Sequence, residues 1–130
     1  DMAIKVVNVA DRLAETLVVD TSADTTSSGS GDNIFTGTTK ATKFYCWKID
    51  NSSVNAATYV KATDTTSYSL ASNPDWRFYA PANTVVTYVF PQGITFGTGI
   101  SFVATSTAAS ANSSQTDPAS NVAVTVLGGT

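Results

Sequence analysis

The residue types that most often carry enzyme chemistry are sparse in this sequence. Its 130 residues include no histidine and a single cysteine, Cys46. Without histidine, Ser-His-Asp and Cys-His catalysis, most zinc sites and the usual proton shuttle of neutral pH are excluded. Cys46 stands between aromatic residues in a strand-like segment, where a small inert hydrophobic side chain is the simplest interpretation. A lone cysteine also excludes an intrachain disulfide.

Carboxylates are the remaining candidates for acid–base chemistry or metal binding. Two of them are enough for glycoside hydrolysis, but Asp50, Asp64 and Asp75 fall at predicted strand ends, where they are typical turn residues. The aspartates within residues 20–32 could in principle bind calcium, yet their spacing matches no known calcium motif. The sequence therefore predicts no catalytic residue, no metal site, no cofactor and no enzymatic activity.

Aromatic side chains could bind a ligand without catalysis. The chain has two Trp, five Tyr and six Phe. Several of them could line a sugar-binding face, because aromatic rings stack on carbohydrate, and packing in a core or an interface explains them equally well. Both interpretations stay open for Trp47, Trp76, Tyr59, Tyr68 and Tyr79.

Charge and hydropathy exclude two classes of partner. Only 13% of the residues are charged and the net charge is −3. The seven basic residues are not clustered, so we expect no nucleic-acid partner. No apolar run approaches the about 18 residues of a membrane span, so we expect no membrane insertion. A nearly neutral surface rich in Ser and Thr is typical of a protein packed against other protein, or of a robust extracellular or virion surface.

The strongest strand signal lies between residues 80 and 105. Two apolar runs, 84–90 and 100–105, alternate with a period of two. The connection between them carries Pro91 and glycines, which predicts a hairpin at the centre of the core. The alternation places on inward faces Val86, Tyr88 and Phe90 in the first run, and Ile100, Phe102 and Ala104 in the second.

Further strands are predicted on either side of this pair. Residues 43–50 and 56–63 flank an Asn-rich turn and predict a β-hairpin. In the first of them, Tyr45, Trp47 and Ile49 share one face, and Phe44, Cys46 and Lys48 share the other. Shorter strands are predicted at residues 76–79 and 121–127.

Together these signals predict an all-β fold. About seven to nine short strands with turns between them indicate an antiparallel β-sandwich, either jelly-roll or Ig-like. We expect an N-terminal arm or pair of edge strands over residues 1–20, a polar flexible loop over 21–33 and the sandwich domain over 34–130.

Two blocks of the sequence resemble a known pattern. Residues 48–64 (KIDNSSVNAATYVKATD) contain a strand, an Asn-rich turn and a YVK-type strand. Residues 79–106 contain Phe90-Pro91-Gln92-Gly93, then Ile94-Thr95-Phe96, and then Thr98-Gly99-Ile100-Ser101-Phe102. In this order the blocks resemble small β-sandwich capsid decoration (cement) proteins of tailed bacteriophages.

The resemblance implies a virion structural protein on the capsid exterior. Such a protein binds the outer face of the major capsid protein shell and stabilises it, and it is a homo-oligomer, with a trimer favoured. Its affinity would come from interface burial, with contacts expected from the arm and from outward aromatics: Ile4, Val6, Val7, Val9, Leu13, Tyr59 and Trp76. Two alternatives are a phage tail or fibre module and an extracellular carbohydrate-binding or adhesin domain.

Overall fold

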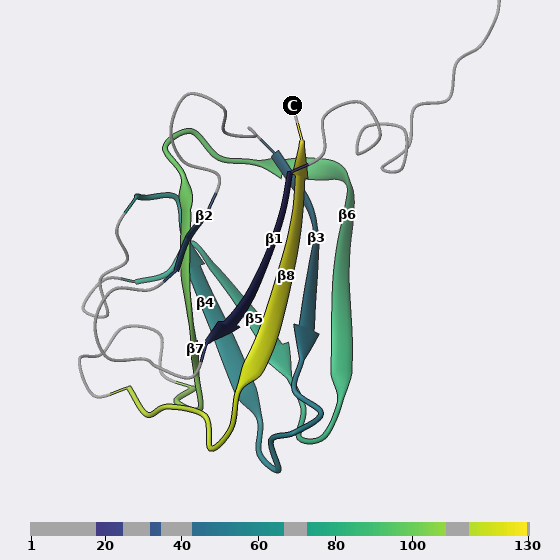
Figure 1. Ribbon diagram of the computed structural model, residues 1–130. Helices are drawn as coiled ribbons and strands as arrows, with labels where there is room; N and C mark the ends of the chain where they lie inside the picture. The colour runs from purple at the N-terminus through teal and green to yellow at the C-terminus, as the bar shows by residue number, and fades with distance from the viewer. Residues whose placement is uncertain (1–17, 25–31, 35–42, 67–72, 109–114, 130) are drawn as a thin grey trace, which may run out of the picture.

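The computed structural model describes residues 18–24, 32–34, 43–66, 73–108 and 115–129 (Figure 1). All regular elements in these residues are strands, in the order β1 (Val18–Asp24), β2 (Asp32–Ile34), β3 (Lys43–Asp50), β4 (Thr58–Thr63), β5 (Trp76–Ala80), β6 (Val85–Thr95), β7 (Ile100–Thr105) and β8 (Val122–Gly129).

The strands form two antiparallel sheets, as expected for a β-sandwich. Strands β8, β3 and β6 form the body of the first sheet, and β7, β4 and β5 form the body of the second. Strand β1 pairs with β8 at one edge of the first sheet, and β2 pairs with β7 at one edge of the second. The two sheets stand face to face in Figure 1. The predicted all-β class is confirmed.

The core lies between the sheets, and it is largely aromatic at its centre. Trp47 is fully buried, and its ring stacks on Phe78 of the opposite sheet with ring centroids 4.9 Å apart. The Trp47 ring is also nearly perpendicular to that of Phe102, with ring centroids 5.5 Å apart. Burial of each large side chain stabilises the fold by about 1.5–3 kcal/mol. The inward residues predicted for β6 and β7 all lie in this core or pack against it.

Both predicted hairpins are wrong. Strand β3 pairs with β6 and β8, whereas β4 pairs with β5 and β7, so the chain crosses between sheets after β3. Likewise β6 and β7 belong to different sheets, so they do not pair with each other. The period of two shows which side chains face inward, but it does not show which strands pair.

Buried Asn51 holds the first of these crossings. Its Nδ2 donates to the carbonyl oxygens of Ala56 and Pro81, each at 2.9 Å, and its Oδ1 accepts a hydrogen bond from Thr58 Oγ1. These bonds join the end of β3, the start of β4 and the end of β5. A buried side-chain amide with partners of this kind can replace the backbone ladder that a hairpin would have supplied.

A β-bulge changes the predicted faces of β3. The register of β3 shifts between Phe44 and Cys46 against both β6 and β8. Phe44, predicted on the face opposite to Trp47, is therefore fully buried in the core beside it, with ring centroids 5.6 Å apart. An extra residue in one strand reverses the inward and outward order beyond it.

The predicted arm and polar loop are covered only in part. The boundary predicted at residue 20 falls inside β1, and β2 includes the last residues of the predicted loop. Ile4, Val6, Val7, Val9 and Leu13 lie outside the described residues. Within the described part of the chain no helix is long and apolar enough to cross a membrane.

Candidate partner-binding surface

The outer face of the second sheet is largely covered by the chain itself. The outward side chains of Lys61, Ser101, Val103 and Thr105 are all buried. Segments 106–108 and 115–117 cross this side of the sheet: Thr105 Oγ1 donates to the Thr116 carbonyl at 2.9 Å, and Arg77 donates to the Ala108 carbonyl at 2.8 Å. We call this side the covered face.

Lys61 is the most buried cation of the covered face. Its Nζ donates to the Thr107 carbonyl oxygen at 2.8 Å and to Gln115 Oε1 at 2.6 Å. Burial, and secondarily the positive charge of Arg77, lower the pKa of Lys61 to about 8. Because the amine is bound by oxygen acceptors of the overlying segments, its role in this geometry is to hold them on the sheet.

The outer face of the first sheet is open. The outward side chains of β6 are exposed, with 49% of the Val85 surface and 56% of the Val89 surface accessible. The outward side chains of β6, β3 and β8 form three rows across the sheet. In the order of these strands, the rows are Val89, Cys46 and Leu127; Thr87, Lys48 and Thr125; and Val85, Asp50 and Ala123. These nine residues form what we call the open face.

The open face carries little charge, with one lysine and one aspartate among nine side chains. Burial raises the pKa of the Cys46 thiol, an effect that the positive charge of Lys48 partly opposes. A raised pKa keeps the sulfur protonated near neutrality, which disfavours a role as nucleophile. With the thiol protonated, Lys48 and Asp50 are the two charged groups that this face presents.

The three candidate carboxylates act in turns, as predicted. The Asp50 carboxylate accepts hydrogen bonds from the hydroxyl and the backbone N–H of Ser52, which lower its pKa. Asp75 accepts from the backbone N–H of Asp64 at 2.8 Å. Asp64 itself accepts from three consecutive N–H groups of the turn before β7: Gly97 at 2.8 Å, Thr98 at 2.8 Å and Gly99 at 3.1 Å. In the described residues no group of three or more His, Cys, Asp and Glu side chains is placed to hold a metal ion.

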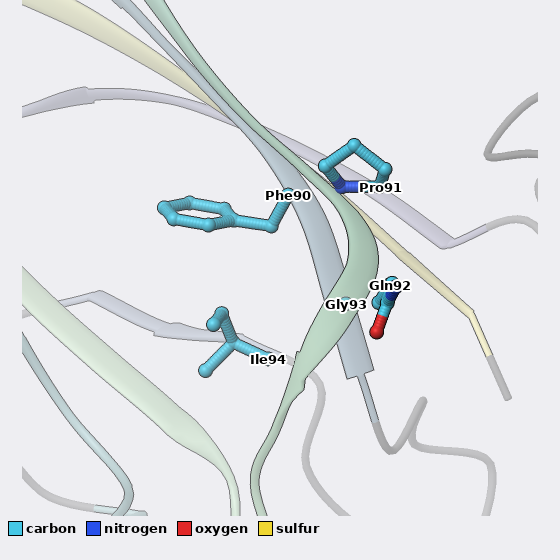
Figure 2. Close-up of a pocket in the computed structure, with 5 residues that line it drawn as sticks. All are labelled: Phe90, Pro91, Gln92, Gly93 and Ile94. Atoms are coloured by element: carbon cyan, nitrogen blue, oxygen red, sulfur yellow. The ribbon is translucent and has the colours of Figure 1, made fainter.

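A hollow of about 350 Å³ lies along β6 where the strand bends (Figure 2). It is lined by Phe90, Pro91, Gln92, Gly93 and Ile94. Figure 2 shows the side chains of Phe90 and Ile94 on one side of the strand and that of Pro91 on the other. None of the five residues is ionisable, so the hollow offers shape and apolar surface but no acid, base or nucleophile.

The structure places the two described residues of the expected contact set differently. Tyr59 is half-buried on the outer side of β4, where its ring lies 5.5 Å from that of Tyr79. Trp76 points inward and packs against the core: its ring is perpendicular to that of Phe44, with ring centroids 5.2 Å apart. Of the five aromatics considered for sugar binding, Trp47 is fully buried and Tyr68 lies outside the described residues.

The valines of the open face did not stand out in the sequence. Their signal is the absence of charge over the whole of β6 (VVTYVFPQGIT), combined with a period of two that leaves Val85 and Val89 outward. Comparisons with protein-family models, curated proteins and solved structures gave no match.

Proposed function

We propose that this protein is a non-enzymatic structural protein of a virion, a capsid decoration protein that binds the outside of the shell through its open face. The observation that carries the proposal is the uncovered face of the first sheet, with exposed Val85 and Val89 and only two charged residues. The resemblance of residues 48–64 and 79–106 to capsid decoration proteins supplies the class of partner, the major capsid protein.

The strand order supports a jelly roll as the finer description of the sandwich. The first strand pairs with the last, β2 with β7, β3 with β6 and β4 with β5. This is the order obtained when one long antiparallel ribbon is wound into two Greek keys. Jelly rolls are common in capsid proteins and also in lectins, so the fold permits this function without specifying it.

Burial of the open face supplies the binding mechanism. Removal of apolar surface from water stabilises a complex by about 25 cal/mol per Å². A face with few charges also loses little hydration energy when a partner covers it. The proposal includes a homo-oligomer on the capsid exterior, with the trimer that the resemblance implies.

Rebinding to stripped particles tests the proposal. Purified protein should rebind capsids from which it has been removed, and Val85→Asp/Val89→Asp should reduce binding at least tenfold while the melting temperature of the free protein changes little. The matched control, Ser53→Asp/Asn55→Asp, adds the same charge at exposed positions of the β3–β4 connection and should bind normally. Normal binding by the valine variant would exclude the open face.

The arm is tested by deletion of residues 1–17, which leaves β1 intact from Val18. If the arm contributes contacts, the truncated protein keeps its fold and loses capsid affinity. Unchanged affinity would show that the expected contacts of Ile4, Val6, Val7, Val9 and Leu13 are wrong.

Binding experiments with the purified protein also distinguish the two alternative functions. Attachment to tails or fibres in place of capsids would favour the tail module. Binding to a glycan array that Tyr79→Ala abolishes would favour the carbohydrate-binding domain, because Tyr79 and Tyr59 are the described tyrosines that stand side by side on an outer surface.

A further inference from the structure

In the part of the chain that the structure describes, β6 is an edge strand, and its residues 85–89 carry neither charge nor proline. It ends the order β1-β8-β3-β6 of the first sheet, and it is the outermost strand at the right of Figure 1. Its eleven residues include no charged side chain. Soluble proteins usually protect such an edge with charge, brevity or a covering segment, because unpaired backbone groups are a template for another strand.

The backbone groups on the free edge can be assigned from the ladder with β3. The N–H of Asn51 donates to the carbonyl of Thr84 at 2.8 Å, so these opposed residues form a hydrogen-bonded pair. Hydrogen-bonded and non-hydrogen-bonded pairs alternate along an antiparallel ladder. Val86 and Tyr88 therefore point their polar groups toward β3, and Val85, Thr87 and Val89 point theirs toward the free edge.

We propose that two copies of this chain associate by antiparallel pairing of their β6 strands about a two-fold axis at Thr87. In this register Thr87 lies opposite Thr87 of the second copy, and Val85 lies opposite Val89. The pattern Val-Thr-Val at alternate positions is the same in both directions, so like side chains meet at both ends. Each outward N–H then faces an outward carbonyl of the other copy.

Residues at both ends of this short ladder prevent it from extending further. Continuation of the same register would place Asn83 opposite Pro91. Pro91 has no N–H to donate. Asn83 has a φ of 55°, which is incompatible with an extended strand. Pairing is thus confined to residues 85–89.

Charge and size specify the kind of association. No charged side chain lies on the paired edge, so two copies meet without like-charge repulsion, and Lys48 and Asp50 stand one strand away from the axis. Five residues a side are far fewer than the about 20–30 of a standard interface. The dimer is therefore weak and concentration-dependent in solution, and a high local concentration strengthens it. The dimer forms without a capsid, so its test can fail while capsid binding holds. It is a two-fold contact, distinct from the trimer that the resemblance implies.

Single cysteines test the register in a Cys46→Ser background. Thr87→Cys brings its two sulfurs opposite each other, with Cα atoms about 5.5 Å apart, within reach of a disulfide. Val85→Cys alone places its two copies four residues out of register, about 13 Å apart, and is the matched control with a similarly exposed position. Under mild oxidation Thr87→Cys should give a covalent dimer of twice the 13.5 kDa chain mass, and the control should remain monomeric.

Two further measurements complete the test. A mixture of Val85→Cys and Val89→Cys should cross-link to the heterodimer, which neither variant forms alone. Analytical ultracentrifugation of the unmodified protein should show a monomer–dimer equilibrium that Thr87→Pro weakens at least tenfold, since proline removes one outward N–H. Equal cross-linking by Thr87→Cys and Val85→Cys, or a strict monomer at millimolar concentration, would overturn the proposal.

Discussion

The hydroxyl of Tyr88 bonds to both backbone polar groups of Tyr79. It donates to the Tyr79 carbonyl and accepts from the Tyr79 N–H at 3.2 Å. Tyr88 lies on β6 of the first sheet and Tyr79 on β5, the edge of the second. One side chain therefore joins the two sheets at their rim and occupies backbone groups that an edge strand would otherwise present.

Replacement of Tyr88 by phenylalanine should destabilise the protein by about 1–2 kcal/mol, because two hydrogen bonds are lost while the ring stays in place. Urea unfolding measures the change. Tyr59→Phe, which removes a hydroxyl from the outer side of β4, should change stability by less than about 0.5 kcal/mol. An equal effect of both substitutions would show that the rim bonds contribute nothing specific.

Asp64 should be the most sensitive surface carboxylate. Asp64→Ala leaves three consecutive N–H groups at residues 97–99 without their acceptor, and we expect a loss of about 2–3 kcal/mol. Asp64→Asn keeps one acceptor oxygen and should lose less. Thermal unfolding compares the two variants. A change below about 0.5 kcal/mol, which is the range of ordinary surface substitutions, would contradict this role for Asp64.

Gly93 is required by the bend of β6. It has a φ of +76°, and a Cβ there would lie 2.8 Å from Tyr45 Cε1 and 3.0 Å from Lys43 Cδ. Gly93→Ala should therefore cost about 2–4 kcal/mol from backbone strain and overpacking. Gly97→Ala is the matched control, because a Cβ there would meet only Asp64 Oδ2, at 3.9 Å. Similar denaturation midpoints for the two variants would refute the argument.

Lys61 should make stability depend on pH. Its pKa of about 8 in the fold lies below the ordinary value of 10.5. Between these values the unfolded chain binds the proton that the folded chain has released, so stability rises with pH in this window. Relative to Lys61→Met, the free energy of unfolding of the wild type should rise from about pH 8 to pH 10, because the folded chain has released the lysine proton that the unfolded chain still binds.

Unfolding midpoints at several pH values measure this difference, and the common comparison with Lys61→Met cancels titrations elsewhere. Lys48→Met, at an exposed position, controls for the loss of one positive charge. A wild type that loses stability relative to Lys61→Met as pH rises would show the opposite sign and exclude burial as the dominant influence on this amine.

The sequence predicted much of the fold because strand alternation is a local property. The inward positions of β6 and β7 follow from a period of two, and the structure confirms them. The pairing of strands was not predictable in the same way, since β3 finds its partners in β6 and β8 far along the chain. The bulge next to Tyr45 was missed as well, and with it the burial of Phe44.

For the candidate surface, the sequence by itself determined the chemistry and its limits. No histidine, one cysteine and an uncharged β6 segment are facts of composition, and the prediction of a non-enzymatic binding protein depends on them. Only the tertiary structure decided which of the two outer sheet faces is exposed to solvent. Segments 106–108 and 115–117 cover the second sheet through bonds to Lys61, Thr105 and Arg77, and the first sheet keeps Val85 and Val89 exposed. The physical reason is that exposure depends on contacts between residues distant in sequence, which periodicity does not encode.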